Sequence, residues 1–208
     1  MIALSSLTAL ATGLFTFRFL SKEMRILVFY TALAIIGEIV TAVLAKKGIN
    51  NLWSIHIFTF VEYFFYAMVF SYWQKNLMFT KILRRSTLGF FFLGIVLMLS
   101  VEDLSSFNNY TKPIECILLI AISAYTLLEI SKEYATLLED PRFWICIAVL
   151  LYVSSTLILF ALSNTLIGFP RQILQGVWSI YIVMNMVVYF LFAKGFLCQY
   201  QIQKSGGH

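Results

Sequence analysis

The sequence predicts an all-α polytopic membrane protein, a bundle of seven transmembrane helices. Of its 208 residues, 61% are hydrophobic and only 12% are charged, and its mean hydropathy is +0.87. A soluble domain carries roughly twice that charged fraction. Apolar segments of membrane length alternate with loops too short to hold a folded domain. We therefore expect one transmembrane domain, 1–200, followed by a flexible tail, 201–208.

The first three apolar segments each approach the length of about 20 residues that a helix needs to cross a bilayer. The first has no basic region before it, so we expect a retained helix rather than a signal peptide. Its Arg18 lies near its end and can reach the interface. The second ends before Gly48, a residue suited to a helix C-cap. The three segments are 2–20, 26–45 and 52–73.

Four more segments complete the predicted bundle. The fourth is short, and we expect it to take in 82–86 or to thin the bilayer locally. Pro113 is expected to open the fifth helix, and Asp140 with Pro141 to form the N-cap and first position of the sixth. The chain enters the seventh through Gly168, Phe169 and Pro170. The four segments are 87–101, 114–130, 143–163 and 173–198.

The basic residues predict the orientation of this bundle. Eleven of the 15 lysines and arginines fall in the loops of one side, and cytoplasmic loops carry such an excess. The other four are Lys46, Lys47, Lys112 and Arg171. The N-terminus is thus expected outside and the C-terminus inside, in a multi-pass protein of the cell membrane of the bacterial inner-membrane type.

Polar and ionisable residues at membrane depth indicate where function lies, because they are costly there. Helical spacing places several of them on shared faces, and the depths of these faces converge in the outer half of the bundle. The candidate ligand- or proton-binding residues are Glu38, His56, Thr59, Glu62, Tyr63, Tyr66, Tyr152, Ser155, Trp178, Tyr181 and Asn185. A small, polar stripe that includes Glu38 on the second helix predicts close packing against a neighbour.

Glu38 and Glu62 are expected to face one interior space from adjacent helices. Two carboxyls close together in a low dielectric cannot both ionise cheaply, so at least one should stay protonated near neutral pH. The alternative is that both are hydrogen-bonded groups holding helices together. His56 would tune the site, or it is an interfacial residue without a role. Glu115 favours a helix N-terminus.

Several chemistries lack the residues they need. No HExxH motif accompanies the one intramembrane histidine, and no GxSxG motif surrounds a serine. Position 185 is asparagine, where a retinal protein similar to the rhodopsins would carry lysine. The three cysteines show no metal-like spacing and are expected to pack. We expect no metal, no cofactor and no nucleic-acid partner, since no basic groove or motif is visible.

The stretch around the third helix resembles a segment of small stand-alone bacterial seven-helix proteins of no known function. The likeness is carried by Asn50, Asn51, His56, Thr59, Glu62 and Tyr63 and covers about an eighth of the chain in its most specific part. The general layout is also similar to the membrane sensor regions of some bacterial receptors, although no kinase or cyclase output domain is present. The resemblance implies the helical layout and no activity.

These observations leave three functions open. The first is an integral membrane protein whose outer polar pocket senses or binds a small molecule or part of a lipid, or passes a proton-coupled substrate. The second is an intramembrane lipid-modifying enzyme that uses Glu62 and His56 as an acid/base pair. The third is a non-catalytic helix-packing partner in a larger membrane complex or homo-oligomer.

Overall fold

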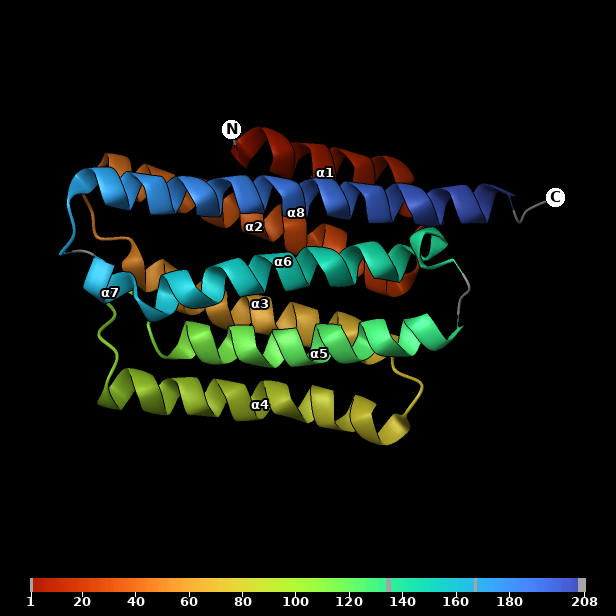
Figure 1. Ribbon diagram of the computed structural model, residues 1–208, viewed down its shortest axis with the longest axis horizontal. Coiled ribbons are helices and arrows are strands. Elements are labelled where there is room, and N and C mark those ends of the chain that lie inside the picture. The colour runs from red at the N-terminus through yellow and green to blue at the C-terminus, as the bar shows by residue number, and fades with distance from the viewer. Residues whose placement is uncertain (1, 134–135, 167, 206–208) are drawn as a thin grey trace.

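The computed structural model describes residues 2–133, 136–166 and 168–205, which form helices joined by short connections and contain no strand (Figure 1). The long helices run alternately up and down a common axis. The elements are α1 (Ile2–Thr16), η1 (Phe17–Phe19), α2 (Lys22–Lys46), α3 (Leu52–Trp73), α4 (Leu77–Ser100), α5 (Thr111–Glu133), η2 (Leu137–Glu139), α6 (Pro141–Ala161), α7 (Ser163–Leu166) and α8 (Arg171–Ser205).

Six of the described helices are long and apolar enough to cross a membrane, namely α2, α3, α4, α5, α6 and α8. The remaining predicted span, 2–20, is divided between α1, which has 15 residues, and the short η1. Fifteen residues fall below the length of about 20 that a spanning helix needs. The fold is therefore a helical bundle with the composition of a multi-pass membrane protein.

The third helix has the bounds that its apolar segment predicts, 52–73, whereas the fourth extends beyond its apolar segment into charged residues. The fourth begins much earlier than predicted, because the Asn76 side chain caps it by accepting from the backbone amides of Met78 and Phe79 at 2.9 and 3.3 Å. It thus reaches full membrane-spanning length.

Two other helix starts rest on the residues singled out in the sequence. The Asp140 carboxylate accepts from the backbone amide of Arg142 at 2.7 Å, which confirms the predicted N-cap of α6. Pro113 lies in the first turn of α5, as predicted, but the helix starts two residues before it, at Thr111. Helix α8 continues to Ser205, past the predicted end at 198 and into the segment predicted as a tail, whose residues 206–208 lie outside the described chain.

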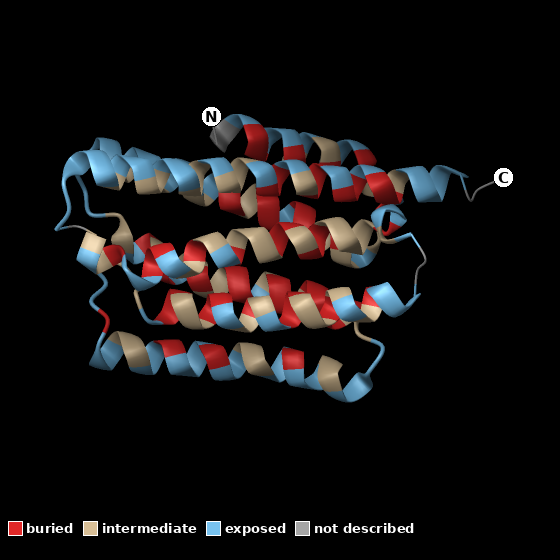
Figure 2. Cartoon of the chain, in the orientation of Figure 1, coloured by how far each residue is buried: buried red, intermediate tan, exposed pale blue. Residues whose placement is uncertain are grey.

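The helices form a layered bundle around α3 and α6. Helix α3 packs on α2, α4 and α5, while α6 packs on α5 and α8. Helix α1 packs along both α2 and α8, and α4 lies at the periphery with few buried residues (Figures 1 and 2). We call the end with the α2–α3, α4–α5 and α6–α8 connections the cap end, and the other the base end.

Candidate functional site

A cavity of about 460 Å³ lies in the cap-end half of the bundle, between α2, α3, α6 and α8. Its walls are largely apolar and aromatic, with a few polar groups, which is the usual make-up of a small-molecule site. Eight of the predicted site residues line it: Glu38, Thr59, Glu62, Tyr66, Tyr152, Trp178, Tyr181 and Asn185. Packing of the bundle thus brings together predicted side chains from four helices, α2, α3, α6 and α8.

The small, polar stripe of α2 forms one wall of this cavity. Ala34, Glu38, Thr41 and Ala45 line it, and the stripe also meets α3, because the Thr41 hydroxyl lies 3.2 Å from the Ser54 hydroxyl. Another close approach to α3 is beside the stripe, at Gly37, where an added Cβ would lie 2.0 Å from the Phe58 ring. Small side chains on the stripe leave open space that larger ones would fill.

The cavity opens between α2 and α8. In the described part of the chain these two helices do not pack along each other. Three wall residues on α2, Glu38, Ala42 and Ala45, are exposed, which marks the opening. Across it, the Tyr189 hydroxyl on α8 donates a hydrogen bond of 3.0 Å to Glu38 Oε1. The carboxyl of Glu38 therefore lies at the mouth of the cavity and is held there by the hydroxyl of Tyr189.

A buried charge cluster forms the inner wall. Lys112 Nζ on α5 lies 2.7 Å from Glu62 Oε2 on α3 and 2.7 Å from Glu115 Oε2 one turn further along α5. Exposure is 3% for Glu62, 3% for Lys112 and 0% for Glu115. The Tyr152 hydroxyl also donates to Glu62 Oε2 at 3.2 Å. We call Glu62, Lys112 and Glu115 the buried triad.

The triad corrects two predictions. Lys112 was expected as a loop charge and Glu115 only as a residue that favours a helix N-terminus, yet both are interior groups. A buried charge is tolerated when it is paired, and here one ammonium serves two carboxyls. Oε1 of Glu62 and Oε1 of Glu115 are buried without a hydrogen-bond partner among the described residues. The triad thus keeps hydrogen-bonding capacity beside the cavity.

Three predicted site residues do not line the cavity. The Tyr63 hydroxyl contacts the Ser86 hydroxyl on α4 at 2.9 Å. The Ser155 hydroxyl donates to the carbonyl of Tyr152 at 2.8 Å, within its own helix. His56 faces the connection between α4 and α5 and has different partners from Glu62. The structure therefore does not bring His56 and Glu62 together as a pair.

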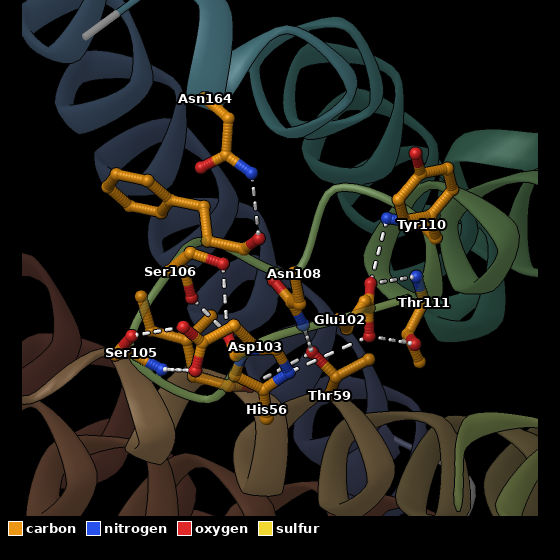
Figure 3. A network of polar contacts seen from close by, with 12 residues as sticks. His56, Thr59, Glu102, Asp103, Ser105, Ser106, Asn108, Tyr110, Thr111 and Asn164 are labelled. Carbon is orange, nitrogen blue, oxygen red and sulfur yellow. Dashed lines mark hydrogen bonds and ion pairs between the residues drawn. The ribbon is translucent and has the colours of Figure 1, made fainter. Parts of the chain in front are cut away.

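The connection between α4 and α5, residues 101–110, folds over the cap end, and we call it the cap loop (Figure 3). His56 Nε2 donates to the carbonyl of Ser106 at 3.1 Å, and its Nδ1 lies 3.7 Å from Glu102 Oε2. The Asn108 amide donates to the Thr59 hydroxyl at 2.7 Å. The buried residues of α3 therefore hold this loop in place.

The cap loop also reaches the cavity wall. The Phe107 ring stacks on Trp178, with 5.6 Å between centroids and 30° between planes. Trp178 lines the cavity from α8. At the exposed side of the loop, the Ser105 hydroxyl and amide donate to Asp103, and these bonds lower the pKa of its carboxyl. The loop thus joins the α3 side of the cavity to the α8 side.

Glu102 anchors the cap loop to the start of α5. Its Oε1 accepts from the backbone amides of Tyr110 and Thr111 at 2.8 and 2.7 Å, and its Oε2 from the Thr111 hydroxyl (Figure 3). Glu102→Ala should loosen the loop at a cost of about 1.5–3 kcal/mol, because buried amides lose a charged acceptor. Hydrogen exchange of amides 103–112 should accelerate.

Asp103→Ala is the matched control, since Asp103 is exposed and its side chain bonds only within the loop, to Ser105, among the contacts described. It should leave exchange at Tyr110 and Thr111 unchanged. Equal acceleration in both variants would mean that Glu102 does not hold the loop.

Sequence reasoning missed Lys112 and Glu115 as a functional pair, and it also left Tyr30 and Tyr189 out of the site. A signal for the first two was present. Proline is tolerated in the first turn of a helix, not only before it. With α5 started at Thr111, Lys112 and Glu115 are three residues apart and share a face.

No group of three or more histidine, cysteine, aspartate or glutamate side chains that could hold a metal ion occurs among the described residues. The three cysteines, Cys116, Cys146 and Cys198, are buried and unpaired in disulfides. Burial among helix contacts is the packing role expected of them.

Comparison of the chain with protein-family models, with curated proteins and with solved structures gives no match.

Proposed function

We propose that this membrane protein binds a small amphipathic molecule, or the corresponding part of a lipid, in the central cavity. The observation that carries the proposal is the cavity itself: about 460 Å³, walled by aromatic and aliphatic side chains, with Glu38 at its mouth and Glu62 and Lys112 on its inner wall. This volume falls within the range of small-molecule sites. A bundle held together only by packing would have no need of such a space.

The proposal places the cavity on the outer side of a cell membrane, the bacterial inner membrane in our reading. Eleven basic residues belong to the base end. Because Lys112 is buried in the triad, only Lys46, Lys47 and Arg171 remain as basic residues of the cap end. This stronger bias supports a cytoplasmic base end and a C-terminus inside. We also propose seven spans, in which α1 crosses the membrane together with the six helices that are long and apolar enough to do so.

The enzyme alternative finds less support. An acid/base pair must share a reacting group within hydrogen-bond reach. Glu62 contacts Lys112 and Tyr152, whereas His56 contacts Ser106 and Glu102. A binding function needs no such pair and uses the residues that do line the cavity.

A cavity-filling variant tests the proposal. In Ala34→Phe, the new ring occupies the cavity wall, where it should fit because open space lies beside it. Saturable binding of the neutral fluorophore prodan to the protein in nanodiscs should fall by about tenfold or more, since ligand and ring compete for the same space. Fluorescence titration against empty nanodiscs measures the change.

Ala121→Phe is the control, because Ala121 is exposed on α5 and does not line the cavity. It makes the same substitution on the outer surface of the bundle, so prodan binding should stay at the wild-type level. Saturable binding that survives Ala34→Phe unchanged, in a folded variant, would place the ligand elsewhere.

A second cavity favours transport as the other candidate function. It has a volume of about 530 Å³ and lies at the base end, where Met24 and Trp73 contribute to its walls. Tyr30 and Tyr66 line the central cavity from the same two helices, about 10 Å away along each helix axis. Uptake of a bound solute into proteoliposomes would support transport, and binding without uptake would support a receptor.

A further inference from the structure

The charges of the central cavity do not balance. Its charged wall residues are Glu38, Glu62 and Lys112. Lys112 is engaged by Glu62 and also by Glu115 directly behind it, so its charge is fully used inside the triad. Glu38 has no ion pair among the described residues and accepts only the hydroxyl of Tyr189. The wall therefore presents an uncompensated carboxyl to whatever occupies the cavity.

An anion would be a poor occupant. It would have to take Lys112 from two carboxylates at 2.7 Å each, in a place that is 3% exposed. It would also meet the carboxyl of Glu38 at the mouth and that of Glu62 on the inner wall. A cation meets the opposite situation, because an opposite charge near a carboxylate in a low-dielectric site stabilises both.

The uncharged part of the wall suits an organic cation in particular. Aromatic faces attract ammonium groups through their quadrupole, and this attraction grows when water is excluded. Rings come from all sides of the cavity except α5: Tyr30, Phe58, Tyr66, Tyr152, Phe160, Trp178, Tyr181, Tyr189 and Phe192. Lys112 Nζ itself lies 5.4 Å from the centroid of the Tyr152 ring, so one ammonium already sits against this wall.

We propose that the ligand of the cavity is an organic ammonium ion with an apolar body, and that Glu38 is its counter-ion. The inference rests on the proposed binding function and specifies the ligand class. The ammonium lies at the mouth between α2 and α8, against Glu38 and the ring of Tyr189. The apolar body extends toward the aliphatic wall, where Ala34, Ile55 and Val188 lie.

Three probes of similar size separate charge from shape. Phenyltrimethylammonium and tert-butylbenzene share one outline and differ only in nitrogen for carbon, and benzenesulfonate carries the opposite charge. Saturation-transfer NMR on the protein in zwitterionic nanodiscs, with empty nanodiscs as blank, gives the affinity of each. The ammonium should bind about tenfold tighter than its neutral isostere, and the sulfonate should not compete with it.

Glu38→Gln keeps the size and the acceptor for Tyr189 but removes the charge. It should weaken phenyltrimethylammonium about tenfold and leave tert-butylbenzene unchanged. Glu129→Gln is the matched control, because that glutamate pairs with Lys132 at the base end. It should change neither affinity.

The results distinguish this inference from the function on which it rests. If ammonium and neutral isostere bind wild-type protein equally, and both are lost in Ala34→Phe, the cavity is a binding site and the cationic ligand class is wrong. If the ammonium binds tighter but Glu38→Gln does not weaken it, Glu38 is not the counter-ion. If prodan and all three probes fail to bind, both proposals are wrong.

Discussion

Lys112→Met should destabilise the protein by about 3–5 kcal/mol, enough to leave it largely unfolded in detergent, because removing the ammonium strands two buried carboxyls. Methionine fills similar space, so the loss reports charge rather than volume. Both carboxyl partners lie 2.7 Å from Lys112 Nζ, and neither is more than 3% exposed. Thermal unfolding followed by size-exclusion chromatography measures the effect.

Two variants make this result specific. Lys132→Met removes a lysine that pairs with Glu129 at the exposed base end, so its unfolding temperature should stay close to that of the wild type. Adding Glu62→Gln and Glu115→Gln to Lys112→Met removes the stranded charges and should recover most of the stability. A Lys112→Met protein as stable as the Lys132→Met protein would show that the triad is not a buried charge cluster.

The two carboxyls of the triad should substitute for each other. Glu62→Gln leaves Lys112 paired with Glu115, and Glu115→Gln leaves it paired with Glu62, so each single change should cost about 1 kcal/mol. The double variant leaves a buried ammonium without a carboxylate and should cost about 3–5 kcal/mol. The excess over additivity, measured by denaturant or thermal unfolding, is the coupling energy.

Glu115→Gln combined with Glu129→Gln controls for additivity. The two residues lie on the same helix, about 21 Å apart along its axis. Distant sites without shared partners add, so this double variant should equal the sum of its singles. If the destabilisations caused by Glu62→Gln and Glu115→Gln also add, then one carboxyl does not replace the other as the partner of Lys112.

The predicted residues of α2, α3 and α8 that line the cavity could be found because polar residues recur there at helical spacing within long apolar segments. Glu38 and Glu62 line one cavity, as expected from their depth and their neighbouring helices. The expectation that at least one of the two stays protonated was built without Lys112, which contacts Glu62 and not Glu38 among the contacts described. Because the start of α5 was predicted too late, Lys112 was assigned to a loop, and its positive charge was left out of the charge balance of the cavity.

Other features could not be predicted because their partners carry no side-chain signal. His56 bonds the backbone carbonyl of Ser106, and every residue offers such a carbonyl. The start of α4 was missed for a different reason. Lys81, Arg84 and Arg85 interrupt the apolar pattern there, yet charged residues near a helix end can extend to the interface while the helix continues.

The contact between α1 and α8 has a consequence for biosynthesis. Gly13 of α1 lies against Phe196 of α8, where an added Cβ would be 3.2 Å from the ring, and the Phe15 and Tyr200 rings are 6.2 Å apart. Gly13 and Phe196 are 183 residues apart in the sequence, so α1 is synthesised long before its partner on α8. Until α8 enters the membrane, the face of α1 that will meet it is bare to lipid or to the insertion machinery. The contact between α1 and α8 can therefore form only after α8 has been synthesised, and a pause in translation before α8 leaves that face of α1 without its partner.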